Sequence, residues 1–310
     1  MDGTRSSRRI WLTLFWLTLC VCVLSAIACD RRPSENALPT PADRLKPALV
    51  SLSPGITETI VELGAREQLV GISDYCELDL DPRSAQSSPA RVGSALTPNY
   101  EAIARLRPDL ILASEVAGNQ LKPLTQLAKT VSLPWLDLSQ VTSSIKQLSQ
   151  LIGKETEGAR LVTRLETALS AQPNPTAQRV LWVLDLGDSA QNETWFIRAN
   201  SLHGAALRAA GARNAVPDTI TGQAKLSAEQ LLKLDPDVIL IVLTAQDMSA
   251  QDLNAAKARA HRHFSRFSPL KAVKNDHIVM LHHAGAMNIG PGVLRLIPAL
   301  SHALAQVQLP

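Results

Sequence analysis

The chain has 310 residues, of which 45% are hydrophobic, 4% aromatic and 19% charged. This length allows one large domain or two of ordinary size, and the apolar share is typical of a globular protein with a packed core. The formal net charge is +3, but three of the 31 basic residues and one of the 28 acidic residues lie in the first 28 positions. The remaining 28 basic and 27 acidic residues nearly balance, which argues against nucleic acid as a partner.

The first 28 residues have the organisation of an export signal. Basic residues come first, an apolar run covers residues 10–27, and small residues precede Cys29. Residues 25–29 are similar to a bacterial lipobox, although Ala26 stands where a leucine is usual. We therefore expect residues 1–28 to be a signal peptide and Cys29 to be acylated. The alternative is an uncleaved transmembrane anchor, because about 18 apolar residues are just long enough to span a bilayer.

Cysteine usage agrees with export. Cys20 and Cys22 lie in the apolar run and Cys29 follows it, so Cys76 is the only cysteine of the body. If Cys29 is acylated, no intramolecular disulfide is expected in the mature protein. Residues 29–46, rich in Pro, Arg, Asp and Ser, are expected to form a flexible tether.

The folded body is expected to begin with a short buried strand over residues 48–52. Ser53 and Pro54 then supply an N-cap and a first helical position, and Gly64 ends that helix. Residues 51–55 also faintly resemble the turn that carries a nucleophilic serine, but the N-cap explains Ser53 better. Metalloprotease and phosphate-loop motifs are missing from the sequence, which therefore offers no catalytic motif.

A passage that starts at Glu101 returns 128 residues later, starting at Glu229. In both copies, apolar residues at helical spacing lead to Pro-Asp and then to an apolar run, which predicts a helix, a tight turn and a buried strand. Asn99 and Ser227 precede the glutamates by two places and are candidate N-caps. Two copies of one supersecondary unit indicate two similar lobes, and we expect a cleft between them.

A second echo relates Gly64 to Gly211, each of which closes a helix, but these copies are 147 residues apart. Between Gly64 and Glu101 the first copy therefore holds 19 residues more than the second copy holds between Gly211 and Glu229. These additional residues lie within the Ser-, Pro- and Asp-rich stretch 71–98. Because function is often carried by an extra loop of this kind, Tyr75 is a candidate ligand contact.

Strands alternating with helices continue to the C-terminus, which indicates two Rossmann-like α/β lobes with mostly parallel sheets. After the first copy, the pattern predicts a helix, a strand and two further helices, at 122–128, 131–136, 142–152 and 154–170. The last helix, about 25 Å long at ~1.5 Å per residue, lies between the repeats and is the natural connector. We expect an N-terminal lobe, a single connecting helix and a C-terminal lobe, at residues 47–152, 153–172 and 173–310.

Four further residues are candidates for ligand contact. Glu115 closes the strand of the first repeat, and His282 and His283 follow the strand 278–281, at the edge where open α/β sheets bind ligands. Neighbouring residues of a strand point to opposite faces, so the histidines are not expected to hold one metal ion, and a plain surface position is the alternative. Trp195 is either an edge-packing residue or a flat wall for a planar ligand, worth ~1 kcal/mol per stacked ring.

Glu101 and Glu229 also have two explanations. The helix dipole favours a carboxylate in the first helical turn by ~0.3–1 kcal/mol, and this alone accounts for an acidic residue at each position. The alternative is a pair of binding contacts, one on each lobe.

In their order along the chain, these motifs resemble the substrate-binding proteins of the iron-chelate/cobalamin ABC importers. The resemblance covers about residues 47–305 and rests on four stretches, 50–58, 69–75, 92–101 and 106–111. It implies two lobes joined by one long helix, a ligand in the cleft, and one glutamate per lobe that contacts arginines of the permease. The matching positions are Glu101 and Glu229, and Tyr75 corresponds to an aromatic residue that stacks on the ligand in cobalamin-binding members.

The chain departs from the cobalamin-binding pattern at two positions. Ala95 stands where a tryptophan usually precedes the first docking glutamate, and a second expected tryptophan is replaced around Glu115. Heme-binding members use a tyrosine or histidine as axial iron ligand, for which the candidates are Tyr75, His203, His282 and His283.

We therefore expect a lipid-anchored, monomeric binding protein rather than an enzyme, on the periplasmic or other extracytoplasmic face of a bacterial membrane. Its partners would be an ABC permease with its ATPase, and its cargo a corrinoid, a ferric siderophore or heme, in that order. Cobalt or iron would belong to the cargo, with no resident cofactor. The alternatives are a scaffold with an empty cleft and a periplasmic metal-dependent hydrolase that uses Glu115, His282 and His283.

Overall fold

The structure, a computed structural model, describes residues 46–76, 88–172, 174–185, 194–218, 224–244, 248–283 and 285–307. These residues belong to one compact unit that spans Pro41–Pro310. The expected signal peptide, Cys29 and nearly all of the tether at 29–46 lie outside the described residues. Within the described ranges, no helix is both long enough and apolar enough to cross a membrane.

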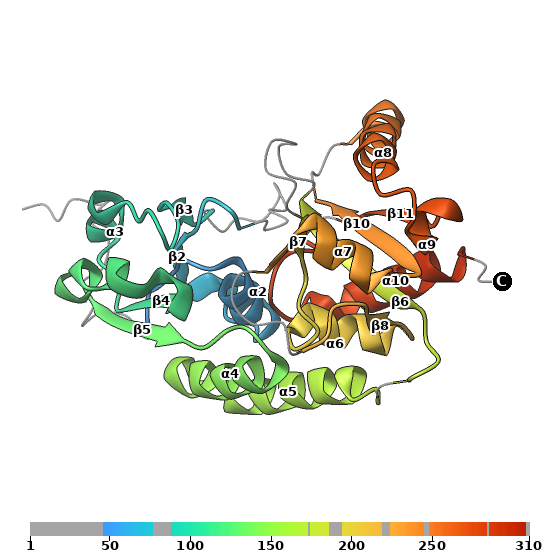
Figure 1. The fold of residues 1–310 in the computed structure, drawn as a ribbon. Coiled ribbons are helices and arrows are strands. Elements are labelled where there is room, and N and C mark those ends of the chain that lie inside the picture. The colour runs from blue at the N-terminus through green and yellow to red at the C-terminus, as the bar shows by residue number, and fades with distance from the viewer. Residues whose placement is uncertain are drawn as a thin grey trace, which may run out of the picture. The chain divides into compact units, whose positions relative to one another are not determined.

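The first sheet has five parallel strands in the order β3-β2-β1-β4-β5 (Figure 1). Its strands are β1 (Leu49–Ser51), β2 (Leu69–Ile72), β3 (Ala90–Arg91), β4 (Leu110–Ser114) and β5 (Lys129–Leu133). One face is covered by α3 (Tyr100–Leu106), and the other by α2 (Pro54–Glu62), α4 (Leu138–Ile152) and α5 (Glu155–Leu169). Neighbouring side chains alternate between these faces, so Val50 packs on the α3 side and Leu49 on the opposite side.

The second sheet has the strand order β11-β10-β6-β7-β9, with β8 paired to β6 outside this path. Its strands are β6 (Arg179–Asp185), β7 (Thr194–Phe196), β8 (Arg213–Asn214), β9 (Lys225–Leu226), β10 (Val238–Leu243) and β11 (Ile278–His282). The pairs that β6 makes with β8 and β10, and that β10 makes with β11, are parallel, whereas β7 is antiparallel to both of its neighbours. The expectation of mostly parallel α/β sheets is therefore confirmed.

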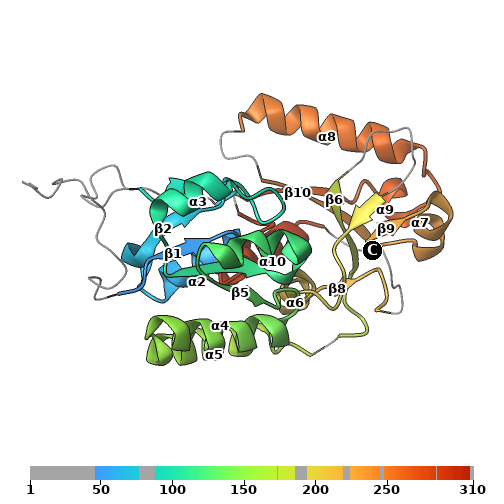
Figure 2. The same ribbon diagram turned by 90° about the vertical axis from the view of Figure 1, so that its left-hand side faces the viewer.

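Helices cover both faces of the second sheet as well. One face carries α7 (Ala228–Leu234), α8 (Ala250–Ser265) and α9 (Lys271–Lys274), and the other carries α6 (Leu202–Ala209) and α10 (Val293–Ala305). The buried cluster under α6 and α10 continues through α2, α4 and α5, and it reaches from Leu240 of the second sheet to Leu49 of the first. Helices α4 and α5 lie side by side in both views (Figures 1 and 2). The two lobes therefore share one buried cluster, and each lobe also has a cluster of its own on the other face of its sheet.

Several element boundaries differ from the sequence-based expectation. The helix expected at 122–128 is a short 3₁₀ helix, η4 (Pro123–Gln126). The strand expected at 131–136 is β5, which ends just before Pro134, because proline lacks the N–H that a strand ladder needs. The helix expected at 142–152 is α4, which begins earlier because Asp137 caps it by accepting the N–H of Gln140 at 2.8 Å.

The start of α2 and the length of α5 also refine the expectation. Ser53 occupies the N-cap position and Pro54 the first helical position, as expected, but the Ser53 side chain makes no capping hydrogen bond. Helix α5, the expected connector, has 15 residues. At ~1.5 Å per residue it is about 22 Å long, slightly shorter than expected.

The 128-residue repeat is reproduced in backbone detail. Helices α3 and α7 have seven residues each, and the side chains of Asn99 and Ser227 accept a backbone N–H of the first turn at 3.0 and 3.2 Å. Both helices end in a left-handed residue, Arg107 with φ 46° and Asp235 with φ 41°. The two N-cap predictions are therefore confirmed.

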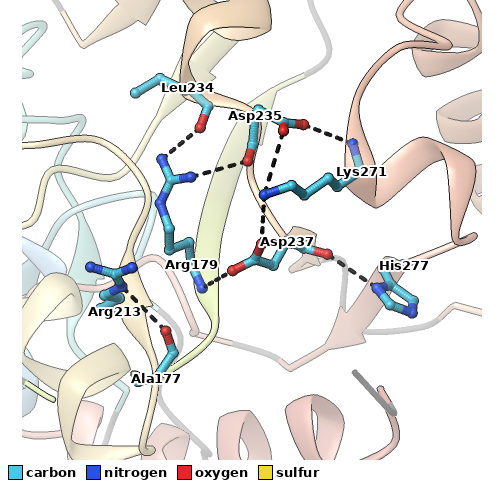
Figure 3. A network of polar contacts seen from close by, with 8 residues as sticks. All are labelled: Ala177, Arg179, Arg213, Leu234, Asp235, Asp237, Lys271 and His277. Atoms are coloured by element: carbon cyan, nitrogen blue, oxygen red, sulfur yellow. Dashed lines mark hydrogen bonds and ion pairs between the residues drawn. The ribbon is translucent and has the colours of Figure 1, made fainter. Parts of the chain in front are cut away.

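The aspartate of each Pro-Asp turn ties its strand to the first strand of its own sheet. Asp109 accepts the N–H of Ala48 on Oδ2 at 2.7 Å, and its own N–H donates to the Ala48 carbonyl at 2.9 Å. Asp237 makes the same two bonds with Arg179, both at 2.9 Å. Figure 3 shows the one in which the Arg179 N–H donates to the Asp237 carboxylate. In the second lobe the Arg179 guanidinium adds a bond to the Asp235 carbonyl at 3.2 Å. The repeated Pro-Asp therefore has one structural role in both lobes.

Gly64 and Gly211 close α2 and α6 in the same manner. Their φ angles are 67° and 87°, a region in which glycine has no steric penalty. The N–H of the residue that follows each glycine donates to a carbonyl of the helix, that of Ile60 at 3.0 Å and that of Leu207 at 3.1 Å. These are the hydrogen bonds of a Schellman cap. The correspondence of Gly64 with Gly211 in the sequence is therefore also a repeat of structure.

Each lobe carries an insertion that the other lacks. Equivalent positions are 131 residues apart at Ala48 and Arg179, 147 apart at Ile60 and Leu207, and 128 apart at the Pro-Asp turns. The second lobe therefore has 16 extra residues between its first strand and α6, and β7 lies in this segment. The first lobe has 19 extra residues between α2 and its Pro-Asp turn, of which 77–87 lie outside the described residues.

Candidate functional site

The candidate ligand residues follow strands at the carboxyl edges of the two sheets. Tyr75 comes shortly after β2 and Glu115 directly after β4, and these strands flank β1 in the first sheet. In the second sheet, His282 ends β11 and His283 follows it, where the His283 N–H donates to the carbonyl of Leu243 in β10 at 3.0 Å. Ligands of open α/β folds bind at this edge.

Trp195 is the middle residue of the short strand β7. In β7 it is paired with Asp185 at the end of β6 and with Lys225 of β9. Its neighbours Thr194 and Phe196 are buried, whereas Trp195 is 38% exposed. The antiparallel insertion therefore holds a partly exposed indole at the carboxyl end of β6.

The carboxyl edges of the two sheets meet at a seam formed by Gly55, Glu58, Trp135, Ile289 and Gly292. Glu58 of α2 accepts the N–H of Gly292 at 2.9 Å, and Trp135 Nε1 donates to the carbonyl of Ile289. A Cβ added at Gly55 would overlap that carbonyl, so only glycine allows the two backbones to approach so closely. Because Gly55 follows β1, Trp135 follows β5 and Gly292 follows β11, these contacts bring the two edges together.

Ion pairs of two arginines lie at the rim of the seam. Arg295 of α10 pairs with Glu58 and lies 3.3 Å from the carboxylate of Glu62. Arg164 of α5 lies 3.4 Å from the same Glu62 carboxylate. Since the arginine side chains are more than half exposed, each pair adds only ~0–1 kcal/mol. The close backbone approach at Gly55 is therefore the stronger constraint on this junction.

The turn that carries Tyr75 is exposed at its tip and anchored at its base. Tyr75 is 73% exposed, whereas the neighbouring Cys76 is buried. The Cys76 thiol donates to Thr57 Oγ1 at 3.1 Å, and the Thr57 hydroxyl donates to Ser51 Oγ at 2.8 Å. Burial raises the pKa of Cys76, the free cysteine of the described body, so this thiol is a structural group rather than a nucleophile.

Glu101 and Glu229 occupy equivalent positions in the first turns of α3 and α7. Their side chains are 79% and 77% exposed, and each pairs with a cation one turn later, Arg105 at 2.9 Å and Lys233 at 2.7 Å. The hydrogen bond from Lys233 lowers the pKa of Glu229, which favours its ionised form. Both explanations of the glutamates, the helix dipole and a binding contact, are compatible with this geometry.

The metal-dependent hydrolase, one alternative drawn from the sequence, meets an obstacle in the structure. Among the described residues, no three His, Cys, Asp or Glu side chains come together in a way that could hold a metal ion. Glu115 and the pair His282–His283, which the hydrolase alternative requires, follow strands of different sheets and are not part of any such group among the described residues.

His203, considered as an axial heme ligand, is a core residue. It is buried, its Nε2 lies 2.8 Å from the Ala286 carbonyl, and burial lowers its pKa. Its ring packs edge-on against the buried Trp182, with the ring centroids 5.5 Å apart. This surrounding makes His203 a packing residue, which corrects the ligand expectation.

Two residues, in β3 and in the turn that follows it, are not singled out by the sequence. Leu96 is 59% exposed, and an apolar residue inside a polar insertion was the available signal. Arg91 donates to three carbonyls of the Tyr75 turn, but a surface arginine has no pattern that reveals such a role. Glu58 and Gly292 are 234 residues apart, so no local pattern relates the two sides of the seam.

Comparisons with known proteins point in one direction. A model of the periplasmic binding protein family matches residues 49–284. The sequence is 29% identical over 252 residues to YhfQ of Bacillus subtilis, which is named as an ABC transporter substrate-binding lipoprotein. The aligned region covers 76% of this chain and 76% of that protein. It is 27% identical over 214 residues to a cobalamin-binding protein of Halobacterium salinarum. The aligned region covers 65% of this chain and 55% of that protein. A solved periplasmic heme binding protein of Pseudomonas aeruginosa shares the fold, with TM-score 0.65 and 24% identity over 86% of this chain and 95% of that chain.

Proposed function

Because this chain belongs to the periplasmic binding protein family, we propose that it is the substrate-binding lipoprotein of an ABC importer and captures a metal chelate. The family assignment confirms the resemblance that the motifs indicated, and it implies an extracytoplasmic location. In this proposal the cargo occupies a cleft between a lobe of residues 47–152 and a lobe of residues 173–310, joined by residues 153–172. The protein delivers this cargo to a permease and its ATPase and catalyses no reaction itself.

The observation that carries the proposal is the equal placement of Glu101 and Glu229. Both lie in the first turn of a seven-residue helix that is capped at the same position and ends in a left-handed residue. Both carboxylates face solvent. A pair of matched acidic contacts, one per lobe, suits a partner that offers two matched cationic sites, as a two-subunit permease does. We propose that arginines of the permease occupy both sites.

The cations beside the glutamates do not prevent this contact. An exposed glutamate and a cation one turn later stabilise a helix by only ~0.3–0.5 kcal/mol. An arginine of the permease, binding in the less solvated interface with two hydrogen bonds, would replace Arg105 or Lys233 at small cost. The second lobe adds the 42% exposed Leu232, where the first lobe has Ala104 at the equivalent position.

Among metal chelates, we rank a corrinoid first, a ferric siderophore second and heme third. Each lobe places one partly exposed ring in its own insertion, Tyr75 in the first and Trp195 in the second. Two such rings suit the flat, largely apolar macrocycle of a corrinoid. In the same proposal, Glu115, His282 and His283 contact the polar substituents of the cargo. The relative from Halobacterium is named as a cobalamin-binding protein, which supports the order.

We propose that acylated Cys29 anchors the protein and that residues 29–46 tether the body to the membrane. The lipobox-like sequence and the name of the Bacillus relative support this assignment. A Cys29→Ala variant is expected in the soluble extracytoplasmic fraction, whereas the wild type is expected in the membrane fraction. Membrane retention of Cys29→Ala would favour the uncleaved anchor instead.

Docking is tested by reversing both charges in a Glu101→Arg/Glu229→Arg variant. We expect cargo binding to be retained and both transport and cargo-stimulated ATPase activity to be lost, because like charges then face each other at both sites. Glu155→Arg is a matched control, since Glu155 is an exposed glutamate in the first turn of another helix, α5. Normal transport by the double variant would refute the docking assignment.

Cargo class is tested by the visible absorption spectrum of protein purified from its native host. Corrinoids, heme and ferric siderophores have distinct bands, so the spectrum identifies the class without prior assumption. Titration with each class should also raise the melting temperature, since a ligand that binds only the folded state stabilises it. No shift with any of the three would favour the empty-scaffold alternative.

A further inference from the structure

The backbone around Tyr75 is held by one arginine from the neighbouring strand. Nη1 of Arg91, in β3, donates to the carbonyl oxygens of Ser73 at 2.8 Å, Cys76 at 2.6 Å and Asp74 at 3.3 Å. These three carbonyls bracket Tyr75 on both sides. The guanidinium is a rigid, permanently charged donor, and charged donors form the stronger hydrogen bonds to carbonyls. Arg91 therefore fixes the course of the turn from which Tyr75 projects.

The same turn is bonded to a second one. The Asp74 N–H donates to the carbonyl of Gly93 at 2.8 Å, and the Gly93 N–H donates to Asp74 Oδ1 at 3.0 Å. Gly93 has φ 82°, and a Cβ there would overlap the carbonyl of Thr97, so the second turn depends on glycine. Leu96 lies in this second turn and is 59% exposed. Tyr75 and Leu96 thus project from two turns that are fixed to each other.

The base of this arrangement is fixed from the opposite side. The buried thiol of Cys76 bonds to Thr57 on α2, and Thr57 bonds to Ser51 on β1. The turn is therefore attached to β3 through Arg91 and to the core through Cys76, although Tyr75 at its tip is 73% exposed. Two large apolar side chains are presented to solvent on backbone that is already ordered.

We propose that Arg91 is a positioning residue that holds Tyr75 and Leu96 as one preformed contact surface for the apolar face of the cargo. This inference rests on the proposed function, because it assigns the surface to cargo binding. Ordering a flexible loop at the moment of binding weakens affinity, and a preformed loop avoids that loss. Since its guanidinium is directed at backbone carbonyls, Arg91 acts through the turn and not as an anion-binding group for the cargo.

The test uses fluorine NMR of protein labelled with 3-fluorotyrosine. The chain has two tyrosines, Tyr75 and Tyr100, so a Tyr75→Phe variant assigns both resonances. Arg91→Met keeps the aliphatic stem and removes the donors, and Arg91→Lys restores one cationic donor. Arg213→Met is the matched control, because Arg213 also donates to a backbone carbonyl, that of Ala177 at 3.2 Å, in the other lobe.

We expect Arg91→Met to shift and broaden the Tyr75 resonance of the cargo-free protein while the Tyr100 resonance stays unchanged. Affinity for cyanocobalamin, hemin or ferric citrate, whichever the wild type binds, should fall about tenfold, equivalent to ~1.4 kcal/mol. Arg91→Lys should recover part of both effects, and Arg213→Met should show neither.

An unchanged Tyr75 resonance in Arg91→Met would overturn the positioning role. A shifted resonance with unchanged affinity for a probe that the wild type binds would overturn the assignment of this surface to cargo. If the wild type binds none of the probes, the proposed function fails for these cargoes, and the fluorine signal still decides whether Arg91 positions Tyr75. If Arg91→Met does not fold, the same readings are taken from Arg91→Lys.

Discussion

Replacing the two Pro-Asp aspartates separately tests whether the repeat has the same energetic role in both lobes. Asp109 accepts the N–H of Ala48 and Asp237 that of Arg179, at 2.7 and 2.9 Å. A hydrogen bond to a charged group contributes ~1.5–3 kcal/mol, and a buried donor left without a partner costs ~1–3 kcal/mol. Ala48 is buried and Arg179 half-buried, so water can replace the lost carboxylate more easily in the second lobe. We expect Asp109→Ala to lower the free energy of unfolding by about 2–3 kcal/mol and Asp237→Ala by about 1–2 kcal/mol.

Urea denaturation followed by circular dichroism measures these differences at neutral pH. Asparagine keeps an acceptor oxygen at the same place, so Asp109→Asn and Asp237→Asn should each lose less than half as much stability as the alanine variant. If asparagine costs as much as alanine, the stabilisation does not come from the bond to the strand. A loss below about 0.5 kcal/mol for Asp109→Ala would refute the role of the buried N–H altogether.

Three further predictions concern the seam and the core. Gly55→Ala should lower the free energy of unfolding by about 3 kcal/mol in urea denaturation, because the new Cβ overlaps the Ile289 carbonyl. Glu58→Ala should cost about 1.5–3 kcal/mol in the same assay, since the Gly292 N–H loses a carboxylate acceptor, and Glu58→Gln should cost less. Burial lowers the pKa of His203 in the folded protein, so below about pH 6.5 the unfolded chain binds more protons and stability falls as the pH falls. His203→Gln should make the melting temperature less dependent on pH between neutral pH and about pH 5.

Matched variants make these predictions decisive. A Cβ added at Gly71 meets side chains, the nearest being Leu106 Cδ1 at 2.8 Å, and side chains can move, so Gly71→Ala should cost less than Gly55→Ala. Equal losses would show that the backbone contact at Gly55 is not the constraint. Glu155→Ala, in the exposed first turn of α5, should change stability by no more than about 1 kcal/mol, the contribution of the helix dipole. An identical pH dependence in wild type and His203→Gln would contradict the assignment of that dependence to His203.

Local chemistry made the repeated elements predictable. Asn99 and Ser227 signal helix starts, and Pro-Asp signals the turn into a buried strand, so both units fold as the sequence indicates. Boundaries were less predictable where two signals compete. Asp137 caps α4 ahead of the periodic region, and Pro123 begins a 3₁₀ helix too short to show helical periodicity.

Contacts between distant segments were not predictable from one sequence. Glu58 follows the helical pattern of α2 as any surface glutamate would. Its partner Gly292 lies in a Gly-Pro-Gly stretch that signals a turn but does not indicate which distant residue it contacts. From the sequence, His203 is one of four candidate axial ligands, whereas the structure buries it in the core, since burial is decided by packing across the whole lobe. Trp195 was identified as a candidate, but its place on an inserted antiparallel strand depends on pairing with β6.

The seam also sets where this chain can change in the course of evolution. Gly55 and Gly290 approach each other so closely that a Cβ at Gly290 would lie 2.9 Å from the Gly55 Cα, so we expect neither position to accept another residue. Tyr75, Leu96 and Trp195 project from insertions that the repeated framework does not need. Under the proposed function, new cargo preferences would arise by substitution in the insertions while the joint between the lobes stays as it is.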